Sequence, residues 1–212
     1  MASHKLFEAP PDFISAEWYK DRAVSDHIHE AAHRGRIIRA LADVCYLLDF
    51  DTENKTVGDF GCGNGGMLWK LKERMPDVES WGYDISPLAV EWATEKYGVN
   101  AKVKDFINED DLRFPDVAIL TEVLEHLVEP IGMLRKLKNG NVRWVVATSP
   151  MWETQERHYE YHLWAWDGAG FKKLFAEAGY FIFAHYGLVG GACQHMIACN
   201  RDALKKPLPT AP

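Results

Sequence analysis

The sequence has no apolar run close to the roughly 18–20 residues that a membrane-spanning helix needs. It has no internal repeat, and residues 1–12 contain no apolar core of the kind found in secretion signals. None of its four cysteines forms a Cys-x-x-Cys pair, which argues against a zinc knuckle or a thioredoxin-type site. We therefore expect a soluble, cytoplasmic protein with free thiols and no membrane partner.

The sequence also lacks an excess of basic residues. Lys and Arg total 24 against 31 Asp and Glu, for a formal net charge of -7. Proteins that grip a phosphate backbone usually carry a basic balance or patch, so a nucleic-acid partner is not favoured but stays open. We interpret the densest basic stretches as solvated helix faces. They are Arg34, Arg36 and Arg39, and Arg135, Lys136 and Lys138.

The chain has 212 residues, 47% of them hydrophobic, which suits one α/β domain. We place that domain at residues 25–204, between an N-terminal arm (1–24) and a flexible tail (205–212) that holds three prolines. Apolar spacing and turn residues predict an ordered series of elements. The expected strands are 56–60, 79–85, 99–103, 116–120, 143–148, 181–186 and 195–199. The expected helices are 25–49, 67–75, 87–97, 122–127, 131–137 and 168–178.

This alternation of strands and helices predicts a doubly wound, mostly parallel, seven-stranded α/β sheet of the Rossmann-like kind. The last two strands are separated only by the glycine-rich stretch 187–192. A parallel pair needs a crossover of about a dozen residues or more, so we expect an antiparallel hairpin at the sheet edge.

A glycine turn, Gly61-Cys62-Gly63-Asn64-Gly65-Gly66, separates the first strand from the next helix. Glycines let a backbone approach a ligand closely, at the carboxyl edge where open α/β sheets bind ligands. Asp84 follows about 20 residues later, where a carboxylate can accept both hydroxyls of a ribose. The spacing differs from the Gly-x-Gly-x-x-Gly of dinucleotide domains, so a NAD-linked reductase is only an alternative.

Five segments resemble class I S-adenosylmethionine (SAM)-dependent methyltransferases. The loop at 59–65 resembles the family's signature loop, 82–86 its ribose-binding strand end, and 104–106 its adenine-side element. The segment 116–127 resembles the subgroup that includes the ubiquinone-biosynthesis O-methyltransferases. His162-Leu163-Trp164 and the helix after it are similar to that subgroup's acceptor region. The resemblance spans about residues 55–185, and the five segments follow one another in the same order as in the family.

The resemblance implies SAM as cofactor and a small-molecule acceptor methylated on oxygen or nitrogen. A SAM-binding protein without catalysis is an alternative, and the oligomeric state is left open. Asp84 is expected on the ribose, Asp105 at the adenine amino group, Phe106 beside the adenine ring, and Gly61 and Gly63 at the methionine part. The full set of expected cofactor contacts is Asp59, Gly61, Gly63, Asp84, Ile85, Asp105, Phe106 and Thr121.

Glu122, Glu125 and His126 form a compact cluster, and at helical spacing the two glutamates share a face. Three interpretations stay open: His126 as a general base, a divalent-ion site with His158 or His162, and solvated or capping carboxylates. The metal interpretation rests on a similarity to small-RNA 3′-end ribose methyltransferases, which use two Glu and two His. We assign catalysis to His126, Glu122 and His162, and assign no metal.

Overall fold

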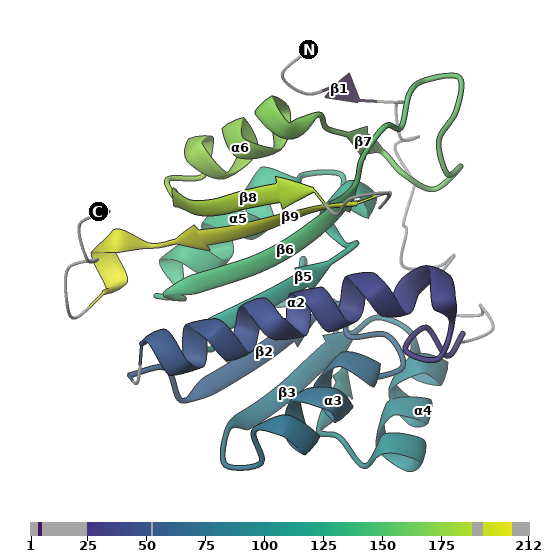
Figure 1. The fold of residues 1–212 in the computed structure, drawn as a ribbon, viewed down its shortest axis with the longest axis vertical. Helices are drawn as coiled ribbons and strands as arrows, with labels where there is room; N and C mark the ends of the chain where they lie inside the picture. Colours follow the sequence, from purple (N-terminus) through teal and green to yellow (C-terminus); the bar gives the residue numbers. More distant parts are fainter. Residues whose placement is uncertain (1–3, 6–24, 52, 188–192, 205–212) are drawn as a thin grey trace.

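The computed structural model of the chain describes residues 4–5, 25–51, 53–187 and 193–204, and has helices on both faces of a central sheet (Figure 1). The helices are α2 (Ala31–Phe50), α3 (Gly66–Arg74), α4 (Pro87–Tyr97), α5 (Pro130–Asn139), α6 (Gly168–Glu177) and the short 3₁₀ helices η1 (Leu124–His126) and η2 (Arg201–Ala203). The strands are β1 (His4–Lys5), β2 (Thr56–Phe60), β3 (Glu79–Asp84), β4 (Ala101–Val103), β5 (Val117–Thr121), β6 (Trp144–Pro150), β7 (Trp164–Ala165), β8 (Phe181–Gly187) and β9 (Cys193–Cys199).

The main sheet has seven strands in the order β4-β3-β2-β5-β6-β9-β8. The first five in this order pair in parallel, and β9 is antiparallel to both β6 and β8. The predicted fold class and edge hairpin are thus confirmed. Strand order reverses between β2 and β5, and in open α/β sheets ligands bind outside the carboxyl ends of the strands at this switch point.

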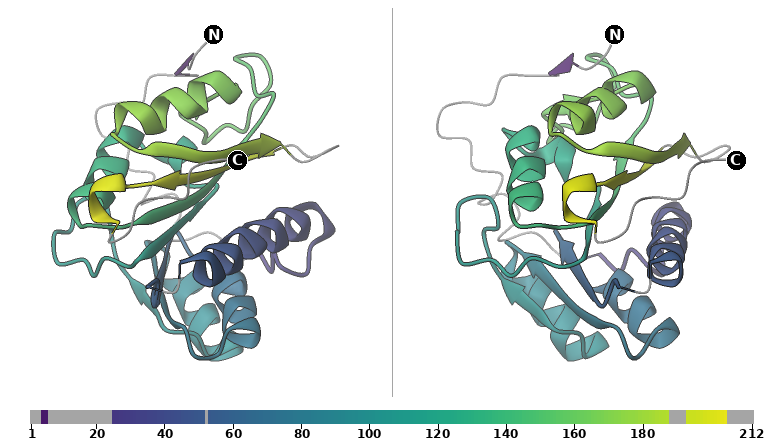
Figure 2. Two further views of the ribbon diagram at one scale, coloured as in Figure 1. Left: turned by 60° about the vertical axis from the view of Figure 1, so that its left-hand side comes forward. Right: turned by 90° about the vertical axis from the view of Figure 1, so that its left-hand side faces the viewer.

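The central strands are mostly apolar because both faces of the sheet are covered. Val117 and Ile119 of β5 pack with α2 and α3, whereas the alternating Ala118 and Leu120 pack with α5 and α6. Figure 2 shows α2 and α5 on opposite sides of the sheet. The sheet is therefore a rigid base for the loops at its carboxyl edge.

Two expected helices differ from the structure. Residues 25–30 form turns rather than the first part of α2, which begins at Ala31, and the amide of His29 donates to the carbonyl of Asp26. The helix predicted over 122–127 is reduced to η1, and Glu122 stands outside it with φ 55. Glu122 and Glu125 therefore do not share a helix face, and that expectation was wrong.

Of the predicted arm, the structure describes only β1, which pairs antiparallel with β7. The rest of the arm and the predicted tail lie outside the described residues. All four cysteines are buried and free. Within the described ranges, no helix is both long and apolar enough to cross a membrane.

Candidate cofactor and catalytic site

The loop after β2 requires glycine for steric reasons. Gly61 has φ +84, and a Cβ built there would lie 2.6 Å from Cγ2 of Val123. Gly63 has φ +52 with nothing within 4 Å of its would-be Cβ. Left-handed backbone suits glycine, and at Gly63 it leaves open space in front of the loop. The amides of Gly61 and Cys62 both donate to the carbonyl of Tyr83, at 2.8 and 3.1 Å, which ties the loop to β3.

Asp84, the last residue of β3, is held by backbone donors. Its carboxylate accepts from the amide of Gly63 at 2.7 Å and from that of Ser86 at 2.9 Å. Burial raises the pKa of Asp84, and the backbone hydrogen bonds, including one from Ile85, act in the opposite direction. The structure thus places Asp84 and Ile85 against the glycine loop.

Asp59 is the most enclosed carboxylate near the loop. It is 1% exposed, and its Oδ1 has no hydrogen-bond partner among the described residues. Burial, followed by the charge of Asp84, raises the pKa of Asp59 to about 8. A buried acceptor without a donor is costly, and such a group is typical of a site that a ligand completes.

The two residues predicted at the adenine, Asp105 and Phe106, already make contacts within the protein. Asp105 caps the turn after β4 by accepting from the amides of Ile107 and Asn108, both at 3.2 Å, and from the Asn108 side chain. Phe106 is buried and packs edge-on against Phe60, with centroids 5.7 Å apart. Their contacts with adenine stay predictions, because both side chains already have structural partners.

A cavity of about 70 Å³ lies at the switch point. Asp59, Gly61, Gly63 and Thr121 line it, which brings four of the predicted cofactor residues together. Ligand pockets for drug-sized molecules measure about 300–1,000 Å³, so this one accommodates one end of a cofactor. Two further lining residues, His27 and Arg36, come from outside the glycine motif.

Sequence reasoning missed Arg36, because a basic residue on a helix resembles a solvated one. Its side chain is only 16% exposed, and its Nη1 lies 3.2 Å from Oε2 of Glu122. Its Nε is buried and has no partner in the described part of the chain. The interpretation of this basic stretch as a solvated face is therefore wrong at Arg36, although Arg34 is exposed.

Glu122, a member of the predicted catalytic segment, contacts Arg36, which lines the cavity. It is one of three non-glycine residues with positive φ among those described. Thr148 donates to its Oε1 at 2.8 Å while Arg36 pairs with its Oε2. Such left-handed conformations cost energy and concentrate at functional sites.

The structure gathers Glu125, His126 and His162, with one donor atom from each within 4.8 Å of the others. The two rings lie 4.6 Å apart. Nδ1 of His126 contacts the carbonyl of Tyr161 at 3.1 Å, and Nδ1 of His162 contacts Oε2 of Glu153 at 2.7 Å. We name these three residues the Glu125 cluster.

Glu125 is the most unusual member of the cluster. Its side chain is 0% exposed, and neither carboxylate oxygen has a hydrogen-bond partner within the described ranges. Burial, then the charge of Glu122, raises the pKa of Glu125 well above its ordinary value. The other predicted members lie elsewhere: Glu122 is held by Arg36, and His158 contacts the carbonyl of Thr154 at 3.0 Å.

Comparison with known proteins agrees with this architecture. The chain resembles the N-methyltransferase NodS from Bradyrhizobium japonicum in complex with S-adenosyl-L-homocysteine (SAH), with 15% identity, TM-score 0.67 and 88% and 96% of the two chains covered. It also resembles magnesium protoporphyrin IX methyltransferase (ChlM) from Synechocystis with bound SAH, with 18% identity, TM-score 0.63 and coverage of 86% and 91%. A third similar structure is the methyltransferase domain of bacterial CtHen1-C, at 20% identity, TM-score 0.59 and coverage of 77% and 97%.

No curated protein matches the chain. The model of a family described as a methyltransferase domain matches residues 31–184, most of the described structure. This range runs from the start of α2 into β8 and includes every candidate residue named so far except His27. With the fold, the switch-point cavity and the family match in agreement, the chain belongs to the methyltransferase-domain family.

Proposed function

We propose that this protein moves the methyl group of SAM to an oxygen or nitrogen of a small-molecule acceptor. The observation that carries the proposal is that Asp59 and Arg36 line one cavity, where Oδ1 of Asp59 and Nε of Arg36 are buried without a hydrogen-bond partner among the described residues. An acidic and a basic side chain suit the amino-acid end of SAM, which carries an ammonium group and a carboxylate. Asp59 would accept from its ammonium group and Arg36 would donate to its carboxylate.

The pKa of Asp59 supports this role. Near pH 7, burial and Asp84 keep a large share of this carboxyl group protonated. A bound ammonium group would favour the charged form. Asp84 is oriented by two backbone amides toward the same loop, and we assign it the ribose hydroxyls. The remaining predicted contacts, Ile85, Asp105, Phe106 and Thr121, would surround the nucleoside.

When bound, SAM supplies an electrophilic methyl group on its sulfonium. The chain's residues would position the acceptor in line with it, an effect worth about 7–11 kcal/mol in favourable cases. A backbone carbonyl can only accept, so Nδ1 of His126 carries the proton toward Tyr161, and in the neutral ring the lone pair is then on Nε2. We propose His126 as the base for an acceptor hydroxyl, with His162 beside it and Glu122 holding Arg36.

The first test is calorimetric titration of the purified protein with SAM and SAH, with NADH as control. We expect saturable binding of both adenosyl ligands and none of NADH. Turnover with a panel of phenols and amines would then separate an enzyme from a binding protein. Binding of NADH without SAM would overturn the proposal in favour of a reductase.

A second candidate is metal-dependent transfer to a ribose hydroxyl of RNA. The Glu125 cluster favours it, because two imidazoles and a carboxylate are a donor set that divalent metals accept. Glu153 would accept a hydrogen bond from Nδ1 of His162 and so orient the ring, as carboxylates commonly do for metal-bound histidines. In this case a chelator would abolish activity, and Mg²⁺ or Mn²⁺ would restore it. The resemblance to the subgroup that includes the ubiquinone-biosynthesis O-methyltransferases favours an oxygen of a small-molecule acceptor instead.

A further inference from the structure

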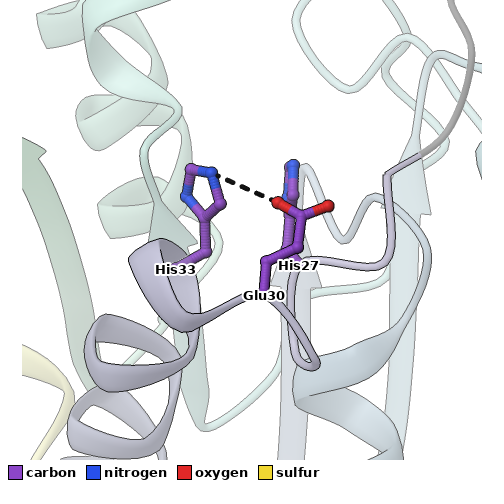
Figure 3. Close-up of side chains that lie close together, drawn as sticks. All are labelled: His27, Glu30 and His33. Atoms are coloured by element: carbon purple, nitrogen blue, oxygen red, sulfur yellow. Dashed lines mark ion pairs between the residues drawn. The ribbon is translucent and has the colours of Figure 1, made fainter.

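A second group of metal-type donors lies at the turn before α2 and in the first turn of that helix, and one member, His27, lines the cavity. His27, Glu30 and His33 each offer one donor atom, and these atoms lie within 4.8 Å of one another. Figure 3 shows the His33 ring facing the Glu30 carboxylate, with the His27 ring seen edge-on next to that carboxylate. Nε2 of His33 lies 3.6 Å from Oε2 of Glu30, and the two ring centroids are 4.4 Å apart.

We propose that His27, Glu30 and His33 bind a divalent transition-metal ion, with Zn²⁺ as the best fit. Zn²⁺ takes histidine nitrogen and carboxylate oxygen at about 2.0–2.2 Å, so two ligands on one ion are at most about 4.4 Å apart. The three donor atoms lie within 4.8 Å of one another, and small rotations of the side chains, two of which are exposed, would bring them onto one ion. Three protein ligands leave one position open.

Local contacts support this assignment. Nδ1 of His33 is buried and has no hydrogen-bond partner among the described residues. His27 also lines the cofactor cavity, so the proposed ion would lie next to it.

The turn before α2 selects which histidine takes part. The string His29-Glu30-Ala31-Ala32-His33 matches the His-Glu-x-x-His zinc pattern, which requires both histidines on one helix. Here α2 begins at Ala31, and the ring of His29 lies 5.8 Å from that of Trp69. His27, brought back by the turn, takes the place that the pattern would give to His29.

Two features oppose a cation and limit its affinity. The cluster lies at the positive end of α2, and Arg36 is one turn further along the helix. Glu122 neutralises Arg36 at 3.2 Å, and Glu30 contributes a negative charge within the cluster. Because these negative charges offset the opposing ones, we expect Zn²⁺ to bind, but more weakly than at a closed four-ligand site.

The test is a Zn²⁺ titration of the metal-free full-length protein against a chromophoric chelator, without SAM. It uses the His162→Ala background, which removes a ligand from the Glu125 cluster. We expect His27→Ala and His33→Ala each to lower Zn²⁺ affinity more than roughly 100-fold, and Glu30→Gln roughly 10–100-fold. The matched control His29→Ala removes the neighbouring ring and should bind as the background does.

Co²⁺ gives an independent readout, because it absorbs in the visible when bound in a tetrahedral site. The spectrum should vanish in His33→Ala and persist in His29→Ala, while far-UV circular dichroism shows both folded. If His33→Ala does not fold, His33→Gln takes its place. The proposal is overturned if the His27 and His33 variants keep background affinity, or if affinity follows His29. SAM binding is measured separately, so either proposal can fail alone.

Discussion

The two sides of the carboxyl edge hold their buried carboxylates in different ways. On the glycine-loop side, two backbone amides donate to Asp84. On the acceptor side, Glu125 is completely buried without any such donor in the described chain. The two amides stabilise the charged form of Asp84 before any ligand binds. Without such a donor, burial favours the protonated form of Glu125 until a hydrogen-bond donor or a cation binds to it. Asp59, on the glycine-loop side, is also buried, and its Oδ1 has no such donor among the described residues.

The largest effect should come from Asp84→Ala. The change removes the acceptor assigned to the ribose and leaves the amides of Gly63 and Ser86 without their partner. Hydrogen bonds to charged groups contribute about 1.5–3 kcal/mol each, so SAM affinity should fall roughly 100-fold or more. Calorimetry measures this, with the exposed Asp110→Ala as control. Unchanged binding would overturn the placement of the ribose.

Arg36→Met tests the amino-acid end of the cofactor. We expect SAM to bind roughly 10–100-fold more weakly, because one charge-assisted contact of about 1.5–3 kcal/mol is lost. Adenosine, which has no carboxylate, should bind to variant and wild type alike. Arg34→Met is the matched control, since it removes the same charge from an exposed position of α2. Equal losses for SAM and adenosine would assign Arg36 a structural role only.

Glu125→Gln tests the acceptor side through the pH dependence of stability. The ordinary pKa of Glu125 is 4.5 and the folded-state pKa lies well above it. Above pH 4.5 the unfolded chain loses this proton while the folded chain keeps it, so the stability contribution of Glu125 declines as pH rises. Below pH 4.5 that contribution is fully present. The slope reaches at most about 1.4 kcal/mol per pH unit and ends at the folded-state pKa.

Urea unfolding at several values between pH 5 and pH 8 provides the measurement. The stability of Glu125→Gln relative to wild type should increase with pH over this interval. Asp59 also has a raised pKa, but it titrates in both proteins and cancels in the difference. Parallel curves for the two proteins would show that Glu125 is ionised in the folded state, and the contrast with Asp84 would disappear.

The smallest effect on stability is expected for Gly63→Ala and its control, Gly98→Ala. Both glycines have left-handed φ, +52 and +59, and neither would-be Cβ has a neighbour within 4 Å. Each change should therefore destabilise the fold by about 1–2 kcal/mol. Only Gly63→Ala should also weaken SAM binding, because its methyl group enters the space at the cavity. Calorimetry and thermal unfolding of the pair separate the two contributions.

Much of this architecture was predictable because it is encoded locally. The strand and helix periods, the turn residues and the glycine loop are each complete within about ten residues. The fold class and edge hairpin followed from their order, and the structure confirmed both. Asp59, Gly61, Gly63 and Thr121 were predicted at the cofactor site and do line one cavity. The start of α2 and the reduction of 122–127 to η1 were not predicted, since turn hydrogen bonds and the φ of Glu122 decided them.

The sequence by itself determined a doubly wound sheet with a glycine loop and a carboxylate at its carboxyl edge. Only the tertiary structure decided which polar side chains meet across that edge. Arg36 reaches Glu122, Glu125 meets His162, and His27 rather than His29 joins His33. These partners are far apart in sequence or separated by an irregular turn, so no local period brings them into register. The packing of α2 and of the segment after β6 against the sheet supplies that register.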